Sequence, residues 1–519
     1  MALGMAHKQP RFEDPRVLLG ERLKGIYRFL ADHGARLFPD DYFADLYTAS
    51  KRGRPTVPAR VLATVMILQA HEGLSDQEAV DRLERDLAWQ AAAGVHCGYE
   101  AFHPTVLVGM RNRLRASAHP KRLFEDTKAV AKTAGVMSGR ARVLDSTPLY
   151  DAVATQDTVT QLRAVIRKLL RLLEGSPLDA KVRATLTRDD DYTSPGKPPC
   201  DWDDRAARDA LVDALVTDAQ AALGALEGAN LEGALADAVQ LLADVAGQDV
   251  EAGEDGTFRI AQKVARDRVI STVDPEARHG HKSHDRHFDG YKTHASIDPD
   301  SELIDEVTVT AANVPDREAV HVLLAPVEDH EDKPIVFGDS AYADGVTLER
   351  LEGRGFQVMA KVPPPASRAG LFSKDHFIVD LDDGTITCPA GEHADIDFDD
   401  KGGGLARFGA LCATCPLASQ CTTNPAGRTV TIHPQEEILQ AHKADQKTAE
   451  WQTAYRATRP TVERKIGHMV RRPWGGRRAR TRGAARVITD VVTRAAAVNF
   501  SRLHVLGVHW DGAAWAAGP

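Results

Sequence analysis

Two short apolar segments, each running into an aspartate, constrain the fold of this chain most strongly. Residues 141–147 and 334–342 have the composition of buried strands, and their aspartates are Asp145 and Asp339. Other segments carry strand signals (290–297, 303–310, 356–362) or helical patterns (316–324, 345–353) in alternation. Strands that alternate with helices predict an α/β fold with a layered sheet, whose ligands gather at the strand ends.

The N-terminal part of the chain is predicted to be helical, because Ala, Leu and Arg recur there at helical spacing. An apolar-faced helix at 58–69 is followed by a Gly-containing turn and a second helix at 76–90. Ser75 and Glu78 have the spacing of a capping box at the start of the second helix. The pair has the outline of a DNA-binding helix-turn-helix. Most such pairs are ordinary elements of helical bundles, so both interpretations stay open.

The charge of the chain is strongly segregated. The formal net charge is -9, yet residues 456–486 contain eleven Arg or Lys residues and a single acid, Glu463. A basic patch on an acidic protein still attracts phosphates, because binding releases their counterions. A solvated surface stretch is the alternative, and the density of positive charge favours a polyanion as the partner.

Glu463 adds a third carboxylate to the two aspartates. The segment 459–472 is predicted to be helical, with Pro460 in its first turn and an apolar stripe of Val462, Ile466 and Met469. Glu463 lies between this stripe and the basic face. Carboxylates on rigid elements are the oxygen ligands that Mg²⁺ prefers. The competing interpretations are a turn-capping role for each aspartate and a surface ion pair of Glu463 with Arg459 or Lys465.

The cysteines form a second constellation. Four of the six lie in one segment, with a C-x2-C pair at their centre: Cys388, Cys412, Cys415 and Cys421. Thiolates at such spacing suit a structural, tetrahedral Zn²⁺, with His393 as a substitute ligand. The segment is expected to need the metal because it is rich in Gly and Asp and poor in apolar residues. Cys97 and Cys200 are interpreted as small buried apolar residues.

The segment 279–287 contains four histidines, but their spacing fits no standard metal site. A solvated, partly cationic loop near DNA is the favoured interpretation, with metal binding as the alternative.

The contexts of Asp145, Asp339 and Glu463 make the chain resemble the DDE transposases of bacterial insertion sequences. The segments 273–278, 288–294 and 309–314 look like the second-strand region of one large subgroup and the residues that follow it. The spacing from Arg459 to Glu463 matches the C-terminal signature of the family. Two positions depart from it: Tyr455 lies one residue too far from Arg459, and Val470 stands where a lysine is usual, with Arg471 next to it.

The resemblance implies an RNase H-like catalytic core in which Asp145, Asp339 and Glu463 hold two Mg²⁺ or Mn²⁺ ions. It also implies double-stranded DNA as partner, both the terminal repeats and the target, and a homodimer in the active DNA complex. The residues expected to contact DNA are Tyr455, Arg459, Arg464, Arg471, Arg472, Arg477 and Arg478.

These observations divide the chain into six parts. We expect an N-terminal helical, DNA-end-binding domain (1–135), a first part of the core (136–156 and 257–365), a helical insertion (157–256), a Cys-rich zinc insertion (366–435), a C-terminal core segment with the catalytic helix and the basic stretch (436–505), and a tail (506–519).

The predicted function is metal-dependent DNA cleavage and strand transfer at the ends of an insertion sequence. The alternatives are a transposase-derived, sequence-specific DNA-binding protein without cleavage activity, and a metal-dependent DNA nuclease. The longest apolar runs are far shorter than the ~18 residues of a membrane span, and no leader is recognisable. The expected location is therefore the bacterial cytoplasm, at the nucleoid, without a membrane partner.

Overall fold

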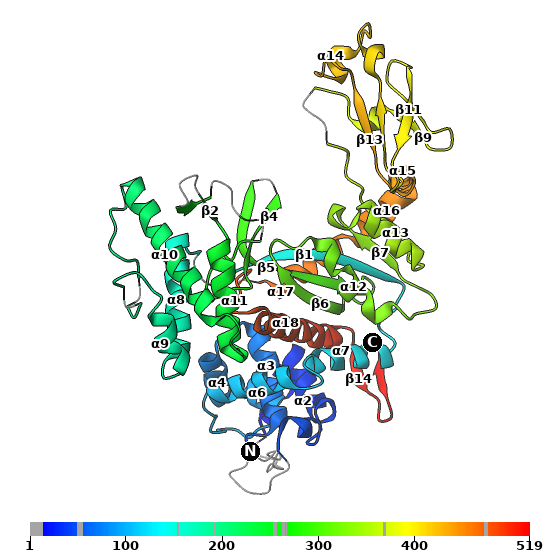
Figure 1. The fold of residues 1–519 in the computed structure, drawn as a ribbon. Helices are drawn as coiled ribbons and strands as arrows, with labels where there is room; N and C mark the ends of the chain where they lie inside the picture. Colours follow the sequence, from blue (N-terminus) through cyan, green and yellow to red (C-terminus); the bar gives the residue numbers. More distant parts are fainter. Residues whose placement is uncertain are drawn as a thin grey trace.

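The computed structural model describes residues 14–518 apart from 49–55, 153–154, 191, 195, 253–256, 262–264, 266, 284, 367–369 and 472–475. A six-stranded mixed sheet lies at its centre (Figure 1). Its strands are β1 (Ala141–Tyr150), β4 (Arg278–Ser283), β5 (Arg286–Ile297), β6 (Ile304–Ala311), β7 (Ile335–Gly338) and β8 (Val358–Ala360). The sheet and its many helices confirm the predicted α/β class.

The order of the central strands is β6-β5-β1-β7-β8. Strands β6 and β1 flank β5, because both pair with its residues 291–297 in antiparallel register. Strands β7 and β8 follow on the other side of β1 in parallel register. An antiparallel half and a parallel half therefore meet at β1.

The His-rich segment is not a loop, as the sequence suggested, but a hairpin of β4 and the first part of β5. His279 stacks on His287 with 5.6 Å between ring centroids, and its Nδ1 lies 2.6 Å from the Asp289 carboxylate. The side chains of His279, His281 and His287 are exposed. The usual alternation of apolar and polar residues is therefore missing, which is why β4 and the first residues of β5 escaped prediction.

The second N-terminal helix predicted at 76–90 is in fact two helices, α4 (Asp76–Arg85) and α5 (Leu87–Ala93). The carboxylate of Asp86 accepts hydrogen bonds from the backbone N–H groups of Ala88 and Trp89, so Asp86 caps a new helix there. The predicted capping box is present: Ser75 Oγ accepts from Glu78 N, and Glu78 Oε2 accepts from Ser75 N.

Helices cover both faces of the sheet. Because successive strand residues point to opposite faces, Val143 packs toward one set of helices and Leu144 toward the other. Leu144 joins the apolar cluster of α12 (Val320–Leu324) and α13 (Gly345–Gly353). Val143 joins a larger cluster with α17 (Pro460–Met469) and α18 (Ala484–Val505).

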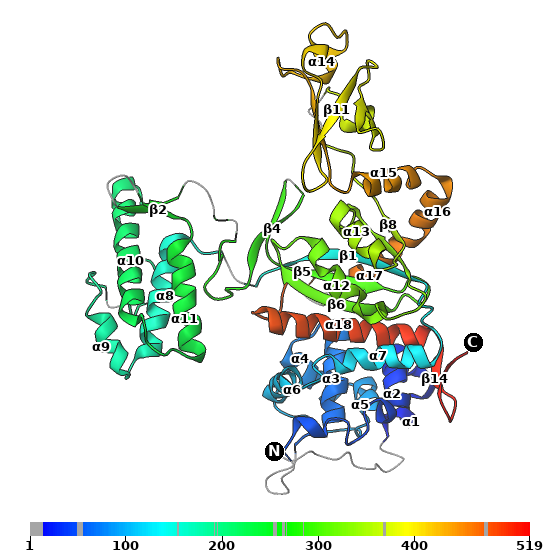
Figure 2. The same cartoon turned by 45° about the vertical axis from the view of Figure 1, so that its right-hand side comes forward.

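Helix α18 lies between the sheet and the N-terminal helices (Figure 2). These are α1 (Pro15–Leu19), α2 (Gly25–Leu37), α3 (Ala59–Glu72), α4, α5, α6 (Thr105–Ala116) and α7 (Arg122–Thr133). Residues 494–500 of α18 are all buried, so every face of the helix is covered there. One apolar cluster consequently runs from the N-terminal helices through α18 into the sheet.

Asn499 fastens α18 to both neighbours. Its side-chain oxygen accepts from Ile304 N at 2.9 Å, and its Nδ2 donates to Ile304 O at 2.8 Å and to Thr127 Oγ1 at 2.9 Å. The amide thus pairs with the edge of β6 as a neighbouring strand would, and it bonds α7 at the same time. Because Asn499 is fully buried, water cannot take its place as the hydrogen-bond partner of Ile304 and Thr127.

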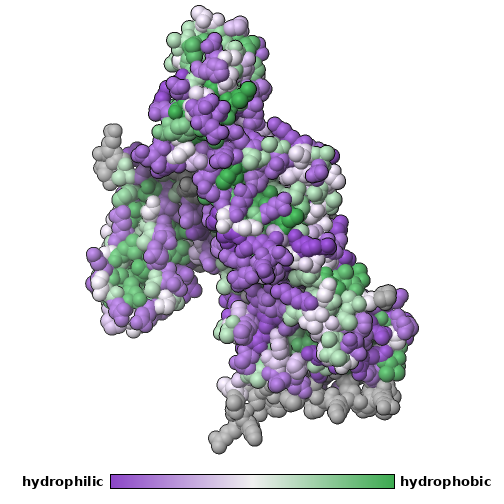
Figure 3. All heavy atoms as spheres, turned by 90° about the vertical axis from the view of Figure 1, so that its right-hand side faces the viewer, coloured by the Kyte–Doolittle hydropathy of each residue, from purple (hydrophilic) through white to green (hydrophobic). Residues whose placement is uncertain are grey.

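Two modules extend from this body, each with its own apolar core. The helical one contains α8 (Thr158–Leu173), α9 (Pro177–Arg183), α10 (Arg205–Leu226), α11 (Gly233–Gly247), β2 (Val250–Ala252) and β3 (Phe258–Ile260). The Cys-rich one, at the top of Figure 3, contains β9 (Ile378–Asp380), β10 (Thr385–Thr387), β11 (His393–Phe398), β12 (Gly404–Arg407), β13 (Thr429–Ile432) and α14 (Ala418–Cys421).

The expectation that the Cys-rich segment has too few apolar residues to form a core is wrong. Phe377, Ile386, Phe408 and Ile432 are buried together between its strands. Helices α15 (Glu436–Asp445) and α16 (Ala449–Thr458) lead from this module to α17, and the hairpin of β14 (Val508–Trp510) and β15 (Trp515–Ala517) follows α18. Over the described ranges, no helix has the length and apolar character of a membrane span.

Replacing Asn499 with Ala is expected to destabilise the protein by about 2–4 kcal/mol, because it leaves buried polar groups of Ile304 and Thr127 without partners. The measurement is the free energy of unfolding in urea. Asn230→Ala, at an exposed site between α10 and α11, is the control. Equal stability of the two variants would contradict the structural role given to Asn499.

Candidate active site

Asp145 and Asp339 lie at one edge of the sheet, although Asp145 does not end its strand as the sequence suggested. Strand β1 continues to Tyr150 because its pairing with β5 does, whereas its pairing with β7 stops at Val143. Asp145 therefore stands just beyond the last parallel pair, and Asp339 directly follows the last residue of β7. The parallel half of the sheet ends at both residues.

A cavity of about 550 Å³ opens at this edge. Glu463, on α17, lines it together with the two aspartates, so three acids that are far apart in the sequence share one cavity. Val462 and Ile466 are buried and hold α17 against the sheet. The other charged residues of the wall are Lys282, Lys292, Asp316, Arg459 and Arg477, with His281 beside them.

Arg459 lies between the two aspartates. Its Nη2 is 3.2 Å from Asp145 Oδ1 and 3.8 Å from Asp339 Oδ2. The side chains of Arg459 and Asp145 are 11% and 15% exposed, while that of Asp339 is 42% exposed. Burial raises the pKa of the Asp145 carboxyl above its usual value, although the Arg459 guanidinium opposes this shift. Arg459 thus supplies the positive charge that two adjacent carboxylates need.

Tyr455 fixes the segment that carries Arg459. Its hydroxyl donates to the Gly338 carbonyl at 3.0 Å, one residue before Asp339. Its ring stacks on Trp451 with centroids 4.6 Å apart. The hydroxyl predicted to contact DNA is therefore bonded to the end of β7, and it aligns α16 with the aspartates.

The predicted DNA-contacting arginines fall into different surroundings. Arg477 lines the cavity, and residues 477–479 pair with the end of β1: Tyr150 N donates to Arg477 O, and Ala479 N donates to Tyr150 O. Arg471 and Arg478 are exposed. Arg464 forms an ion pair with Glu302, to which Lys465 also donates at 2.8 Å. Arg472 lies outside the described residues.

Beside the three acids lies a network of side chains that was not predicted from the sequence. Asp316 accepts from Lys292 Nζ at 2.7 Å and from the hydroxyl of Ser146, the neighbour of Asp145. His294 is almost fully buried next to these groups, and burial lowers its pKa to about 4. The signal was available in β5, where Lys292 and His294 interrupt an apolar strand at alternate positions. Asp316, at the start of a helical turn, gave no comparable signal.

The three carboxylates are suitable ligands for a divalent metal, but they are too far apart in this structure to hold one together. Two aspartates face a single point now taken by a cationic group, and a third carboxylate lines the same cavity. Within the described part of the chain, however, no three His, Cys, Asp or Glu side chains are grouped closely enough to hold an ion. An ion bound to all three acids would require Arg459 to leave the space between the aspartates.

The cysteines show a similar arrangement. Cys388, Cys412, Cys415 and Cys421 all line one small cavity of the Cys-rich module. The backbone N–H of Arg428 donates to Cys412 Sγ at 3.3 Å, and burial raises the pKa of the Cys421 thiol. The four free thiols share this cavity, but among the described residues they are not grouped closely enough to hold an ion. His393 instead forms a hydrogen bond with Thr387.

The helix-turn-helix interpretation concerns α3 and α4. Helix α3 is buried from residue 61 to 70, so only α4 presents a surface. The exposed positions of α4 carry both acids and bases, among them Glu78, Arg82, Glu84 and Arg85. Such a mixed surface favours a bundle element over a major-groove recognition helix.

Two ranges of the chain match known protein families. Residues 387–504 match the family described as "Transposase DDE domain", and residues 20–113 match "Transposase domain (DUF772)". The first range includes the four clustered cysteines, Glu463 and most of α18; neither includes Asp145 or Asp339. No curated protein and no solved structure matches the chain significantly.

Both matched families are domains of transposases, the proteins that move DNA segments. Together they indicate that the chain is an insertion-sequence DDE transposase. Such a protein acts on DNA, and DDE transposases generally use divalent metals such as Mg²⁺.

Replacing Arg459 with Gln is expected to lower the stability at neutral pH by about 1–2 kcal/mol. Removing one partner of a fully buried ion pair destabilises a protein by more than this, but Asp339 is partly solvated, so the expected loss is smaller. Millimolar Mg²⁺ should then raise the melting temperature of the variant more than that of the wild type, because the ion replaces the lost charge. The control is Arg354→Gln, which removes an ion pair with Glu328 away from the cavity. An equal response to Mg²⁺ in all three proteins would argue against competition between Arg459 and a metal.

Proposed function

We propose that this transposase cuts DNA at the ends of its element and joins them to target DNA at the cavity of Asp145, Asp339 and Glu463. The observation that carries the proposal is the convergence of these acids on one cavity from β1, the end of β7 and α17. Three antiparallel strands followed by two parallel ones, with acids at β1 and β7, support an RNase H-like core.

In this proposal the three acids hold two divalent ions. Bound there, the ions would help deprotonate the attacking water or 3′ hydroxyl and would stabilise the leaving oxygen. Arg459, released from the aspartates, can donate to the scissile phosphate with its planar guanidinium. Arg477 and Lys282 on the same wall offset further phosphate charge, which guides the DNA backbone into the cavity.

The surrounding network keeps this edge in position. Lys292 and Ser146 hold Asp316 at the back of the cavity, and Tyr455 ties α16 to the end of β7. These contacts hold the chain next to Asp145 and Asp339 in place. The rearrangement that ion binding requires in this proposal is then the departure of Arg459 from the space between the two aspartates.

The remaining parts receive supporting roles in the proposal. Residues 1–135 help to bind the element ends, and a homodimer brings two ends together. The Cys-rich module binds one structural Zn²⁺ through Cys388, Cys412, Cys415 and Cys421, which already face a common cavity.

Replacing Asp145, Asp339 or Glu463 with Ala should abolish cleavage of labelled element-end DNA in Mg²⁺ while sparing DNA binding. Mn²⁺ should substitute for Mg²⁺ in the wild type, since both accept oxygen ligands. Cuts are mapped on each strand, and Asp329→Ala, at an exposed turn, is the matched control. Cleavage that persists in the Asp145 or Glu463 variant would overturn the assignment, and a wild type that binds DNA without cutting would favour a binding protein.

Zinc analysis of the purified protein should find about one ion per chain. Changing Cys412 and Cys415 to Ser should remove it and lower the melting temperature of the Cys-rich module only, because zinc binding contributes folding free energy where the ligands lie. Cys97→Ser, in the N-terminal helical region, should keep the zinc. A metal-free wild type with unchanged melting temperature would rule out a structural ion.

A further inference from the structure

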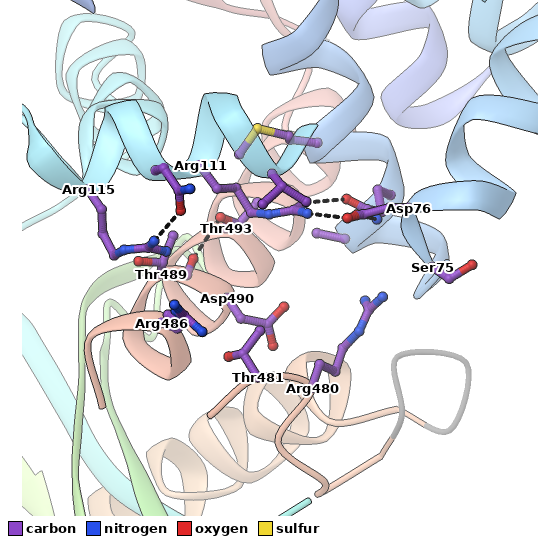
Figure 4. Close-up of a pocket in the computed structure, with 15 residues that line it drawn as sticks. Ser75, Asp76, Arg111, Arg115, Arg480, Thr481, Arg486, Thr489, Asp490 and Thr493 are labelled. Carbon is purple, nitrogen blue, oxygen red and sulfur yellow. Dashed lines mark hydrogen bonds and ion pairs between the residues drawn. The ribbon is translucent and has the colours of Figure 1, made fainter. Parts of the chain in front are cut away.

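A second cavity, of about 470 Å³, lies where the N-terminal helices meet α18 (Figure 4). Its walls come from α3, α4, α6, α18 and the segment just before α18. Four arginines line it: Arg111, Arg115, Arg480 and Arg486. They come from elements that are far apart in the sequence, so the fold alone brings these charges together.

The acids of this cavity are already engaged. Asp76 forms an ion pair with Arg111, and Asp490 forms one with Arg494 at 2.6 Å. Arg115, Arg480 and Arg486 have no carboxylate partner in the part of the chain that the structure describes. Arg115 donates to the Asn112 side chain and Arg480 to the Leu74 carbonyl, while Arg486 is exposed. Three guanidinium groups of this cavity therefore form no ion pair with a described carboxylate.

The positive charges around Arg115 repel its guanidinium group. Burial lowers the pKa of Arg115, and the charges of Arg486 and Arg111 lower it further. Thr481, between two of the arginines in the sequence, has a buried hydroxyl without a hydrogen-bond partner in the described structure. An anion that accepts several hydrogen bonds would satisfy both the repelling cations and this hydroxyl.

The cavity connects to the candidate active site through one short segment. Arg477 lines the catalytic cavity and Arg480 lines this second cavity, while residues 477–479 are held to Tyr150 by two backbone hydrogen bonds. A polyanion that follows this segment meets positive charge at both ends. The forked guanidinium group matches phosphate oxygens in pairs, which favours a phosphate chain over isolated carboxylates.

We propose that the cavity of Arg115, Arg480 and Arg486 binds backbone phosphates of the element DNA beside the segment cut in the catalytic cavity. This inference rests on the proposed function and adds a contact that joins the N-terminal helices to α18 through the DNA. The N-terminal region then holds DNA by phosphate contacts from α6, in addition to any contact made by α4.

The test compares binding of a fluorescent element-end duplex by anisotropy, in EDTA so that no cleavage occurs. Changing Arg115 and Arg486 together to Ala should weaken binding at least about tenfold at 0.1 M salt. The slope of log affinity against log salt should fall by about two, one for each lost phosphate contact. Changing Arg205 and Arg208 to Ala, on exposed positions of α10, is the matched control and should leave both quantities unchanged.

Changing Arg115 and Arg486 to Lys keeps the charge and should restore most of the salt slope, and the melting temperatures of all variants report correct folding. Unchanged affinity and slope in the Ala variant would overturn the inference, even where the acid variants show the expected loss of cleavage. Conversely, cleavage that persists when Asp145, Asp339 or Glu463 is replaced would refute the proposed function, but it would not change the DNA-binding result for the arginine variants.

A separate arm uses inorganic pyrophosphate to distinguish a DNA backbone from a small phosphate ligand. DNA binding that depends on the arginines, without stabilisation by pyrophosphate, supports the DNA assignment. Pyrophosphate that raises the melting temperature of the wild type but not of the Ala variant, with equal DNA affinity in both, would overturn it.

Discussion

The burial of residues 494–500 of α18 on every side is the constraint on which the rest of the structure depends. A helix covered all round needs two partners, and here these are the sheet on one side and the N-terminal helices on the other. Asn499 fixes the register of this arrangement, because its amide can satisfy Ile304 and Thr127 in a single position. The N-terminal helices and the catalytic sheet therefore form one cooperative body, and neither has a complete core without α18.

The candidate site holds two carboxylates that repel each other, and an arginine that lies between them. Asp145 and Asp339 are brought together because β1 and β7 stop pairing at the same edge, and the repulsion between them is relieved by Arg459. Arg459 reaches this place because Tyr455 ties α16 to Gly338. The same arginine that stabilises the free protein occupies the position that a cation requires, so charge neutralisation in the free state and metal binding compete for one point in space.

Local patterns allowed much of this to be predicted from the sequence. The apolar runs before Asp145 and Asp339, the capping box of Ser75 and the stripe beside Glu463 are short-range signals that local sequence determines. Non-local pairing was not predictable in the same way. The extension of β1 to Tyr150 depends on β5, and the β4 hairpin has exposed histidines instead of an alternating pattern. The position of Arg459 between two aspartates likewise depends on tertiary contacts that no single segment encodes.

The helical insertion has a consequence for the order of folding. It separates β1 from β5, the two longest strands of the sheet, which pair with each other along eight residues. A flexible connection of this length would make their encounter slow. The insertion has its own core, and its ends are joined: Gln156 N donates to Ile270 O at 2.9 Å, and Gln161 Nε2 donates to Val269 O at the same distance. If the insertion folds first, it holds its two ends together. The pairing of β1 with β5 then requires the closure of only a short loop.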